Sequence, residues 1–400
     1  MFRSTTATVL GAFTLLAASA GVPSAAPDDD LEPQADAVKL AASIQSQLTG
    51  RAFGWQFAVS QDGKFVQAST AGTSGFALSS ADAGGSPVAM TPTTKMDIAS
   101  ATKTVTAIAT MKLLRANDLT IESRVAPYLP ASWKRGAGFE KAGSGRPQPK
   151  PIRFRHLLAH TSGINQAIAA GGVSIPNGWE GSQTIVKNGG KADSSRVYHN
   201  HNYGLLRVLN AELYKRSAGK PAVTQANHAV YALEHMQKGI FEPAGLKGIT
   251  CAPADPVTAM KSYPVGATQT SKGTLHMGGP ESCAGHRGLF MSAFQHVQLL
   301  AHLRHGEIIE PEDLDEMDEL RLGWNQNADK GANEGAFWHG GDLLGSNQLH
   351  TCGATFDDGT EVSIMVNSPI AGQSTGDLSD KPAPPASPCG VALAAWKAAK

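Results

Sequence analysis

Ser100 and Lys103 are the residues of this 400-residue sequence best suited to nucleophilic chemistry. A short extended stretch, Met96–Ile98, precedes Ser100, and an apolar run with helical spacing, Val105–Leu113, follows it. At about 3.6 residues per turn, the two side chains share one face where that helix begins. A serine hydroxyl is a weak nucleophile until a base takes its proton, and the unpaired N–H groups of a helix N-terminus favour negative charge nearby. The spacing therefore predicts a serine that is activated by an amine.

The same Ser-x-x-Lys spacing occurs a second time, at Ser217–Lys220, where it has a different explanation. Gly219 and Pro221 end a helix rather than begin one, so this second copy is not predicted to be catalytic. The non-catalytic alternative for Ser100 is a serine that caps a helix beside a solvated lysine. Other parts of the chain favour the catalytic interpretation.

Strand patterns lie at both ends of the sequence, and helical patterns lie between them. A hairpin is predicted at Phe57–Gln67 around Asp62–Gly63, and a second at Gln348–Asn367 around Asp357–Gly359. Residues 164–197 have few periodic apolar positions and are predicted to form an irregular loop. This order predicts an α+β fold, in which one antiparallel sheet is built from both termini, is flanked by helices, and carries an inserted, mostly helical region.

Residues 1–20 have the pattern of a secretory signal peptide. Arg3 provides a positive charge, Val9–Ala18 is a short apolar segment, and Ala18–Ala20 offers small residues for cleavage. An uncleaved anchor is the alternative, but the apolar segment is short for a membrane span. We expect a secreted or periplasmic protein with no transmembrane segment after cleavage.

The sequence after the signal is divided into a lead-in and one domain. Residues 21–34 are predicted to be disordered, and 35–400 to form the domain. Its sheet region covers about 35–95 and 330–400, and its helical region about 100–325. No internal repeat was found in it.

The composition indicates the kind of partner. Apolar residues make up 41% and charged residues 17% of the sequence, which suits a globular protein with a sizeable core. The formal net charge is +0, so the basic surface of a nucleic-acid-binding protein is not predicted. We expect a small-molecule or peptide substrate and a monomer.

The cysteines form an even set in the C-terminal half: Cys251, Cys283, Cys352 and Cys389. In an exported protein such a set predicts two disulfides. Three pairings are possible, and proximity in the sequence favours Cys251–Cys283 with Cys352–Cys389.

Other chemistries lack the motifs that they need. His156 and His160 have the i, i+4 spacing of metal ligands on a helix, but no glutamate lies between them as in His-Glu-x-x-His. The sequence has no Gly-x-Ser-x-Gly, no Walker loop and no dinucleotide fingerprint. We therefore predict neither a metal nor a cofactor.

Longer motifs extend the pattern around Ser100. Residues Phe154–Gly163 read FRHLLAHTSG, and Tyr198–Leu206 read YHNHNYGLL. Further matches are Phe241–Leu246, Gly288–Ser292 and His339–Gly341. With the Ser-x-x-Lys, they resemble, in the same order, the motifs of class C β-lactamases and their relatives, over about residues 50–370. These relatives include D-alanyl-D-alanine carboxypeptidases, D-aminopeptidases and family VIII esterases.

The resemblance implies a β-lactamase/transpeptidase-like fold and a role for each motif residue. Ser100 would become acylated, Lys103 would hold and help to deprotonate it, Tyr198 would shuttle the proton, and Asn200 would bind the substrate amide. Free lysine and tyrosine side chains titrate near pH ~10, so neither is a base at neutral pH alone. Packed together, the ammonium stabilises a phenolate.

The same resemblance implies an oxyanion hole. Its N–H donors would come from Ser100 and from Asp342, the residue after His339-Gly340-Gly341. Gly340 and Gly341 would let a substrate backbone lie flat against an edge strand. Loss of one such donor typically costs about 10²–10³ in rate.

Two positions depart from the family pattern. His339 stands where β-lactamases usually carry lysine, and a histidine is only partly charged near pH 7. This favours a peptidase or esterase over an efficient β-lactamase. At Gly285–Gly288 the family's paired glycines are interrupted, so the resemblance does not define the shape of that site wall.

The sequence thus predicts an exported, metal-free serine hydrolase that forms an acyl-enzyme on Ser100 with amide or ester substrates. D-amino-acid peptides are the leading class, as in DD-carboxypeptidases and D-aminopeptidases, followed by small esters. The alternatives are a class C-like β-lactamase and a non-catalytic module that binds penicillin or peptidoglycan fragments.

Overall fold

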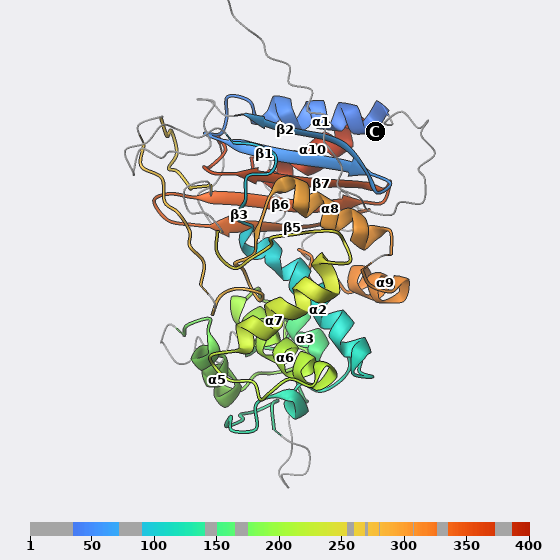
Figure 1. The fold of residues 1–400 in the computed structure, drawn as a ribbon, viewed down its shortest axis with the longest axis vertical. Helices are drawn as coiled ribbons and strands as arrows, with labels where there is room; N and C mark the ends of the chain where they lie inside the picture. Colours follow the sequence, from blue (N-terminus) through green and yellow to red (C-terminus); the bar gives the residue numbers. More distant parts are fainter. Residues whose placement is uncertain are drawn as a thin grey trace, which may run out of the picture. The chain divides into compact units, whose positions relative to one another are not determined.

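The predicted antiparallel sheet is present, and its strands come from both ends of the chain (Figure 1). Within the described residues it has five strands in the order β2-β1-β7-β6-β5. The strands are β1 (Trp55–Gln61), β2 (Lys64–Ala71), β5 (Ala336–Leu343), β6 (Leu349–Phe356) and β7 (Thr360–Val366). Both predicted hairpins are confirmed, since β1 pairs with β2 and β6 pairs with β7. Asp62 and Gly63 have positive φ angles of 51° and 74°, the backbone that a tight hairpin turn requires.

The computed structural model describes residues 35–71, 90–140, 150–164, 175–253, 260–268, 271–279, 281–306, 308–325, 335–372 and 386–400. The predicted signal peptide (1–20) and lead-in (21–34) lie outside these residues. All of the described residues belong to one structural unit, Pro33–Lys400.

Helices cover both faces of the sheet (Figure 1). On one face lie α1 (Ala35–Leu48) and α10 (Pro388–Ala399), which pack on each other and on the strands. On the other face lies α8 (Ala293–Arg304). Because side chains alternate along a strand, Trp55 and Phe57 of β1 join the core under α1 and α10, whereas Ala58 joins the core on the other side. The sheet is therefore apolar on both faces, and all of β1 is buried.

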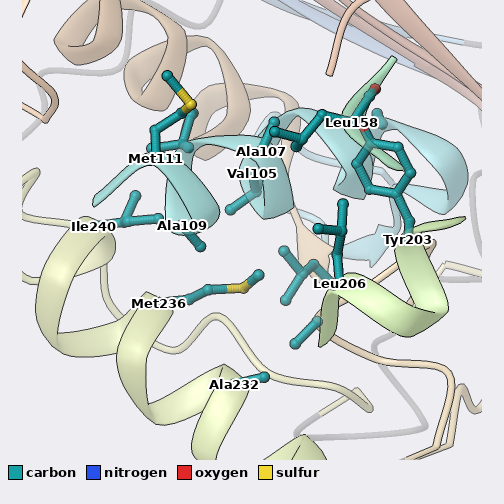
Figure 2. Close-up of a cluster of buried hydrophobic side chains, with 14 of the residues drawn as sticks. Val105, Ala107, Ala109, Met111, Leu158, Tyr203, Leu206, Ala232, Met236 and Ile240 are labelled. Carbon is teal, nitrogen blue, oxygen red and sulfur yellow. The ribbon is translucent and has the colours of Figure 1, made fainter. Parts of the chain in front are cut away.

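The helical region is built around α2 (Thr102–Ala116), which packs between α6 (Asn200–Ala218) and α7 (His228–Met236). Figure 2 shows side chains of α2, among them Val105 and Ala109, in the same cluster as Leu206 of α6 and Met236 of α7. The first three turns of α2 are buried all round. A helix enclosed in this way has little freedom to shift, so the residues at its N-terminus are held firmly.

Shorter elements complete the described chain. They are β3 (Met96–Asp97), a 3-10 turn at Ala99–Ala101, a second at Ala126–Tyr128, α3 (Phe154–Leu158), α5 (Trp179–Asn188), a π-helical turn at Gln237–Phe241, β4 (Phe290–Met291) and α9 (Pro311–Glu319). No helix in these ranges is both long enough and apolar enough to cross a bilayer.

The expectation of an irregular loop at residues 164–197 was wrong for Trp179–Asn188, which form α5, whereas residues 189–197 contain no helix or strand. The buried positions of α5 include Gly181 and Ser182 beside Ile185 and Val186. A Cβ atom at Gly181 would overlap the Pro176 carbonyl oxygen, so close backbone approach takes the place of a large apolar side chain. Only Ile185 and Val186 of the buried positions are large and apolar, so the segment is short of apolar residues in the sequence.

The predicted disulfide pairing is confirmed. Cys251 is bonded to Cys283, with 5.4 Å between their Cα atoms, and Cys352 to Cys389, with 5.1 Å. The second bridge ties β6 to α10, and the first ties the Thr250 segment to the loop that leads to His286.

Candidate active site

Ser100 lies in the 3-10 turn Ala99–Ala101, called here the Ser100 turn, between β3 and α2. The prediction that a helix begins at this serine is confirmed, because α2 starts at Thr102. Ala99 has a positive φ of 48°, an unfavourable backbone for a residue with a Cβ atom. The buried Asp97 carboxylate holds this turn by accepting the Ala99 N–H at 2.8 Å. It also accepts the Gly288 N–H at 3.2 Å, so it joins the turn to the 286–288 loop.

Lys103 lies one turn further on and is completely buried. Its ammonium donates to Ser100 Oγ at 3.0 Å, to Asn200 Oδ1 at 2.8 Å and to the His286 carbonyl oxygen at 2.9 Å. An ammonium has three N–H donors, and these three acceptors lie on the Ser100 turn, on α6 and on the 286–288 loop. The amine is therefore fixed against the serine by elements that are far apart in the sequence.

Tyr198 completes the cluster from the segment that precedes α6. Its hydroxyl lies 2.8 Å from Ser100 Oγ, and Lys103 Nζ lies 4.8 Å from the centre of its ring. The His160 ring packs against the tyrosine with a centroid distance of 4.7 Å. The structure thus brings Ser100, Lys103, Tyr198 and Asn200 together.

The segment that carries Tyr198 is held by backbone bonds to the Phe154–Gly163 stretch. Val197 N–H donates to the His160 carbonyl at 3.1 Å, and Ser194 N–H donates to the Thr161 carbonyl at 3.1 Å. His199 N–H donates to His160 Nδ1 at 3.2 Å. The Phe154–Gly163 motif therefore has a structural role, because it holds the segment that carries Tyr198.

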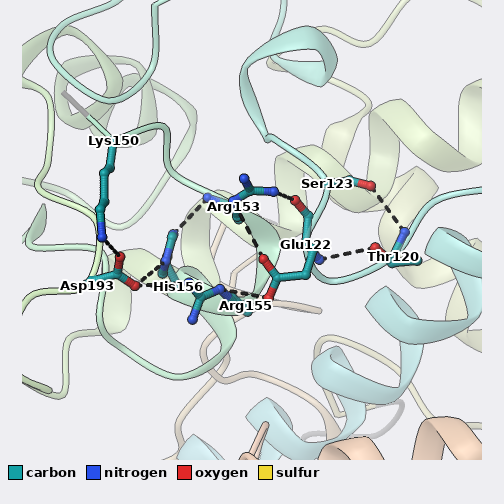
Figure 3. A network of polar contacts seen from close by, with 8 residues as sticks. All are labelled: Thr120, Glu122, Ser123, Lys150, Arg153, Arg155, His156 and Asp193. Atoms are coloured by element: carbon teal, nitrogen blue, oxygen red, sulfur yellow. Dashed lines mark hydrogen bonds and ion pairs between the residues drawn. The ribbon is translucent and has the colours of Figure 1, made fainter. Parts of the chain in front are cut away.

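A polar network anchors the same segment at Asp193 (Figure 3). The Asp193 carboxylate contacts Lys150 at 3.1 Å, Arg155 at 3.0 Å and His156 Nε2 at 2.9 Å. These donors lower the pKa of Asp193. The segment before Tyr198 is thus tied to α3 by charge as well as by backbone.

The metal-ligand alternative for His156 and His160 is not supported by their positions. α3 ends at Leu158, so the two histidines do not share a helical face. His156 Nδ1 accepts the Arg153 N–H, and its other ring nitrogen contacts Asp193. In the described ranges, no three His, Cys, Asp or Glu residues are grouped so that they could hold a metal ion.

His339 lies on β5 beside the cluster, with its ring centre 6.3 Å from that of Tyr198. It is buried, and its Nδ1 contacts the Gly340 carbonyl oxygen at 2.6 Å. Burial and the nearby Lys103 ammonium lower the pKa of His339 to about 3. The expectation of partial charge near pH 7 is thus corrected, since this histidine is neutral there.

β5 packs against the Ser100 turn, and its outer edge, opposite β6, is open. In the described residues no strand pairs with this edge, and the Trp338 carbonyl accepts the Asn325 N–H there at 2.7 Å. Because peptide groups alternate along an antiparallel strand without a bulge, the N–H groups of Gly340 and Asp342 point to the same edge. A Cβ atom at Gly341 would overlap the Ile98 carbonyl oxygen, so the strand and the turn are in close contact. The Asp342 side chain contacts His350 Nδ1.

A cavity of about 620 Å³ opens over Ser100. Ser100, Asn200 and Asp342 line it, together with Glu281 and Arg287. This volume suits a small peptide or a compact ester.

Sequence reasoning missed several residues of this site: Asp97, His286 (through its carbonyl), Glu281 and Arg287. Asp97 stands only three residues before Ser100, so its position offered a signal. The other three belong to a loop whose path depends on the Cys251–Cys283 bridge.

Comparison with known proteins identifies the family. A family model described as Beta-lactamase matches residues 40–378. The chain belongs to the β-lactamase family. As a member, it is a serine hydrolase of β-lactamase/transpeptidase-like fold, as the motifs predicted. Among curated proteins, none matches the sequence.

Solved structures of similar fold include D-amino acid amidase from Ochrobactrum anthropi in complex with D-phenylalanine. It is 16% identical with a TM-score of 0.60, and the match covers 90% of this chain and 100% of that one. A β-lactamase/D-alanine carboxypeptidase from Yersinia pestis is 19% identical with a TM-score of 0.57, over 85% and 94% of the two chains. EstCE1, a hydrolase with promiscuous acyltransferase activity, is 16% identical with a TM-score of 0.59, over 92% and 98%. At these identities the likeness concerns the fold.

Proposed function

We propose that this β-lactamase-family protein is an exported serine hydrolase that forms an acyl-enzyme on Ser100 with amide or ester substrates. D-amino-acid peptides are the leading substrate class. The observation that carries the proposal is the position of Ser100 Oγ, 3.0 Å from Lys103 Nζ and 2.8 Å from the Tyr198 hydroxyl, at the wall of an open cavity.

In the first step, Ser100 Oγ attacks the substrate carbonyl carbon and its proton passes to the deprotonated oxygen of Tyr198, which becomes a hydroxyl. The two oxygens lie 2.8 Å apart, a hydrogen-bond distance, so the proton can pass in either direction. The Lys103 ammonium contacts Ser100 and lies against the Tyr198 ring, where its charge favours a deprotonated oxygen. The carbonyl π electrons move onto the substrate oxygen, which becomes an oxyanion.

The oxyanion is assigned to the N–H groups of Ser100 and Asp342. The first lies at the start of α2, and the second points to the open edge of β5 by strand alternation. Backbone donors that are already in place stabilise the developing charge without reorganisation.

Collapse of the tetrahedral intermediate breaks the bond to the leaving group, which takes the proton back from Tyr198. A water molecule then attacks the Ser100 ester, gives a proton to the same relay, and releases the acid while the serine regains its hydrogen. Asn200 uses Oδ1 on Lys103, which leaves its Nδ2 donors for a substrate amide carbonyl.

The choice of peptides or esters over β-lactams is supported by the neutral His339. The names of the Ochrobactrum amidase and the Yersinia carboxypeptidase agree with D-configured substrates, although they describe those proteins. Export is supported by the signal-like residues 1–20 and by two disulfides, which are typical of an oxidising compartment.

Intact-mass spectrometry after incubation with a fluorophosphonate or a labelled penicillin tests the proposal. The wild type should gain one label, and Ser100→Ala should gain none. Ser217→Ala, in the second Ser-x-x-Lys at the end of α6, is the matched control and should label like the wild type.

A substrate panel then separates the alternatives. Ser100-dependent turnover of a p-nitrophenyl ester or an N-acetyl-D-Ala-D-Ala peptide agrees with the proposal. Fast turnover of nitrocefin would instead indicate a β-lactamase, and no label with any acylating probe would indicate a binding module.

A further inference from the structure

Arg287 is a half-buried cation in the wall of the cavity that contains Ser100. Its guanidinium makes no hydrogen bond or ion pair with the part of the chain that the structure describes. The buried Asp97 is near enough for Arg287 to lower its pKa, against the larger effect of burial that raises it. No carboxylate of the described residues, however, lies within ion-pair distance of the guanidinium.

The other basic groups around the cavity are neutral or already occupied. Lys103 directs its three N–H groups to Ser100, Asn200 and the His286 carbonyl. Burial lowers the pKa of the His286 ring well below its usual value, and burial and the charge of Arg287 lower that of His276. Among the described residues that line the cavity, Arg287 therefore carries the permanent positive charge.

The backbone fixes Arg287 relative to the reacting serine. The carbonyl oxygen of the preceding residue, His286, accepts a hydrogen bond from Lys103. The N–H of the following residue, Gly288, donates to the Asp97 carboxylate. Gly288 has a positive φ of 96°, and a Cβ atom there would lie 3.0 Å from the Cys283 Cα atom. The 286–288 loop is thus bound to Lys103 and, through Asp97, to the Ser100 turn. Arg287 therefore has a fixed position relative to Ser100.

The cavity also has two acidic residues. Asp342 contacts His350 Nδ1 with its carboxylate, and Glu281 Oε1 accepts a hydrogen bond from Gln225 at 3.2 Å. Glu281 forms no ion pair with Arg287, so a ligand that enters the cavity meets both charges separately. A neutral ester uses neither charge. A peptide with a free carboxylate uses the positive one, and a planar guanidinium fork matches a carboxylate with two parallel hydrogen bonds.

We propose that Arg287 binds the C-terminal carboxylate of a peptide substrate and so makes this hydrolase selective for substrates with a free carboxylate. The inference rests on the proposed function, because it names the substrate class of the same Ser100 site. The neutral His339 has no positive charge with which to bind a substrate carboxylate, and this role is assigned to Arg287.

A matched pair of substrates tests this assignment: N-acetyl-D-Ala-D-Ala and its C-terminal amide, which differ only in the terminal charge. The wild type should prefer the acid in kcat/KM. Arg287→Gln should lower kcat/KM for the acid by about 10- to 100-fold, the range expected for a charged hydrogen-bonded pair, while kcat/KM for the amide stays nearly constant. Arg287→Lys should restore part of the preference, because it keeps the charge and loses the fork.

Controls distinguish a failure of this inference from a failure of the proposed function. Arg216→Gln, at an exposed arginine on α6, should not change the ratio of acid to amide. An equal loss on both substrates in Arg287→Gln would overturn carboxylate recognition and assign the arginine a structural role. A wild type without preference for the acid, but with Ser100-dependent turnover of a p-nitrophenyl ester, would overturn this inference alone. Failure to label Ser100 would overturn the proposed function itself.

Discussion

At the scale of single residues, Ser100 Oγ is the point where an amine and a phenol from separate elements meet. Neither group is a base at neutral pH by itself, since both titrate near pH ~10 when free. The structure places both within hydrogen-bond distance of one hydroxyl, at 3.0 Å and 2.8 Å. Their combined effect on the serine is therefore the chemistry that this site supports.

Tyr198→Phe tests the proton relay. The variant keeps the ring that packs against His160 and Lys103 but removes the hydroxyl that contacts Ser100. We expect the rate of acylation by a p-nitrophenyl ester to fall by about 10²–10⁴, the usual contribution of a general acid–base group, with the melting temperature nearly constant. Stopped-flow release of p-nitrophenol measures this rate. An unchanged rate would exclude Tyr198 as the relay.

His339→Gln tests the charge state of the β5 histidine. Because burial and Lys103 hold the pKa of His339 at about 3, its ring stays neutral from pH 5 to pH 8. A glutamine is also neutral and can donate to the Gly340 carbonyl. We therefore expect the shape of the profile of kcat/KM against pH to be the same in both proteins over this range. Loss of a titration between pH 5 and pH 8 in the variant would contradict a neutral histidine.

At the scale of elements, the proposed catalysis depends on the contact between β5 and the Ser100 turn. Thr351 Oγ1 of β6 donates to the Ile98 carbonyl at 2.9 Å, and the missing side chain of Gly341 lets β5 approach the same carbonyl. Asp97 holds the turn from the other side through the Ala99 N–H. The two proposed oxyanion donors, at Ser100 and Asp342, lie on the two partners of this contact.

Gly341→Ala should therefore push β5 and the Ser100 turn apart. The added Cβ atom overlaps the Ile98 carbonyl oxygen, and a displacement of about 1 Å in an active site can cost up to about 100-fold in rate. We expect such a loss in kcat/KM for a p-nitrophenyl ester. Gly345→Ala is the control, because a Cβ atom there meets only the Asn347 carbonyl, at an ordinary 3.6 Å. Equal activities of the two variants would contradict the importance of this contact.

At the scale of the whole molecule, α8 and the sheet enclose a carboxyl group remote from the serine. Glu361 of β7 is fully buried and accepts a hydrogen bond from Ser60 of β1 at 2.7 Å, while its Oε1 has no hydrogen-bond partner in the described residues. Burial raises the pKa of Glu361 from 4.5 to about 7, against the opposing effects of Ser60 and Arg304. The folded protein thus retains a proton that the unfolded chain releases at lower pH.

Glu361→Gln should make the stability less dependent on pH. Because the folded pKa is the higher one, the contribution of Glu361 to stability is full below pH 4.5 and is lost as the pH rises to about 7. At about 1.4 kcal/mol per pH unit, the loss amounts to about 3 kcal/mol. Between pH 4.5 and pH 8, the free energy of unfolding of the variant should therefore rise by up to that amount relative to the wild type.

Urea unfolding at several pH values measures this difference. Glu242→Gln, at an exposed carboxylate, is the control and should show no such trend. If the free energies of unfolding of Glu361→Gln and the wild type differ by the same amount at every pH, then Glu361 has the same proton affinity in the folded and unfolded states.

Local sequence patterns were sufficient for a large part of this description. The turn at Asp62–Gly63, the helix start at Ser100 and the Ser100–Lys103 contact follow from backbone geometry within a few residues. The resemblance of the motifs indicated the family and named the residues that meet at the serine. The helix α5 was missed because its buried face is made partly of Gly181 and Ser182, whose sizes carry little hydrophobic signal.

Local periodicity and motif spacing were enough to predict the fold class, the family and the set of groups that surround Ser100. The charge of His339 could not be predicted in this way, because it depends on burial and on the ammonium of Lys103, 236 residues away in the sequence. The same holds for Asp97, which holds the strained turn, and for Arg287, which lines the cavity without a hydrogen-bond or ion-pair partner among the described residues. Desolvation and charge pairing arise between segments that are distant along the chain, so no local pattern contains them.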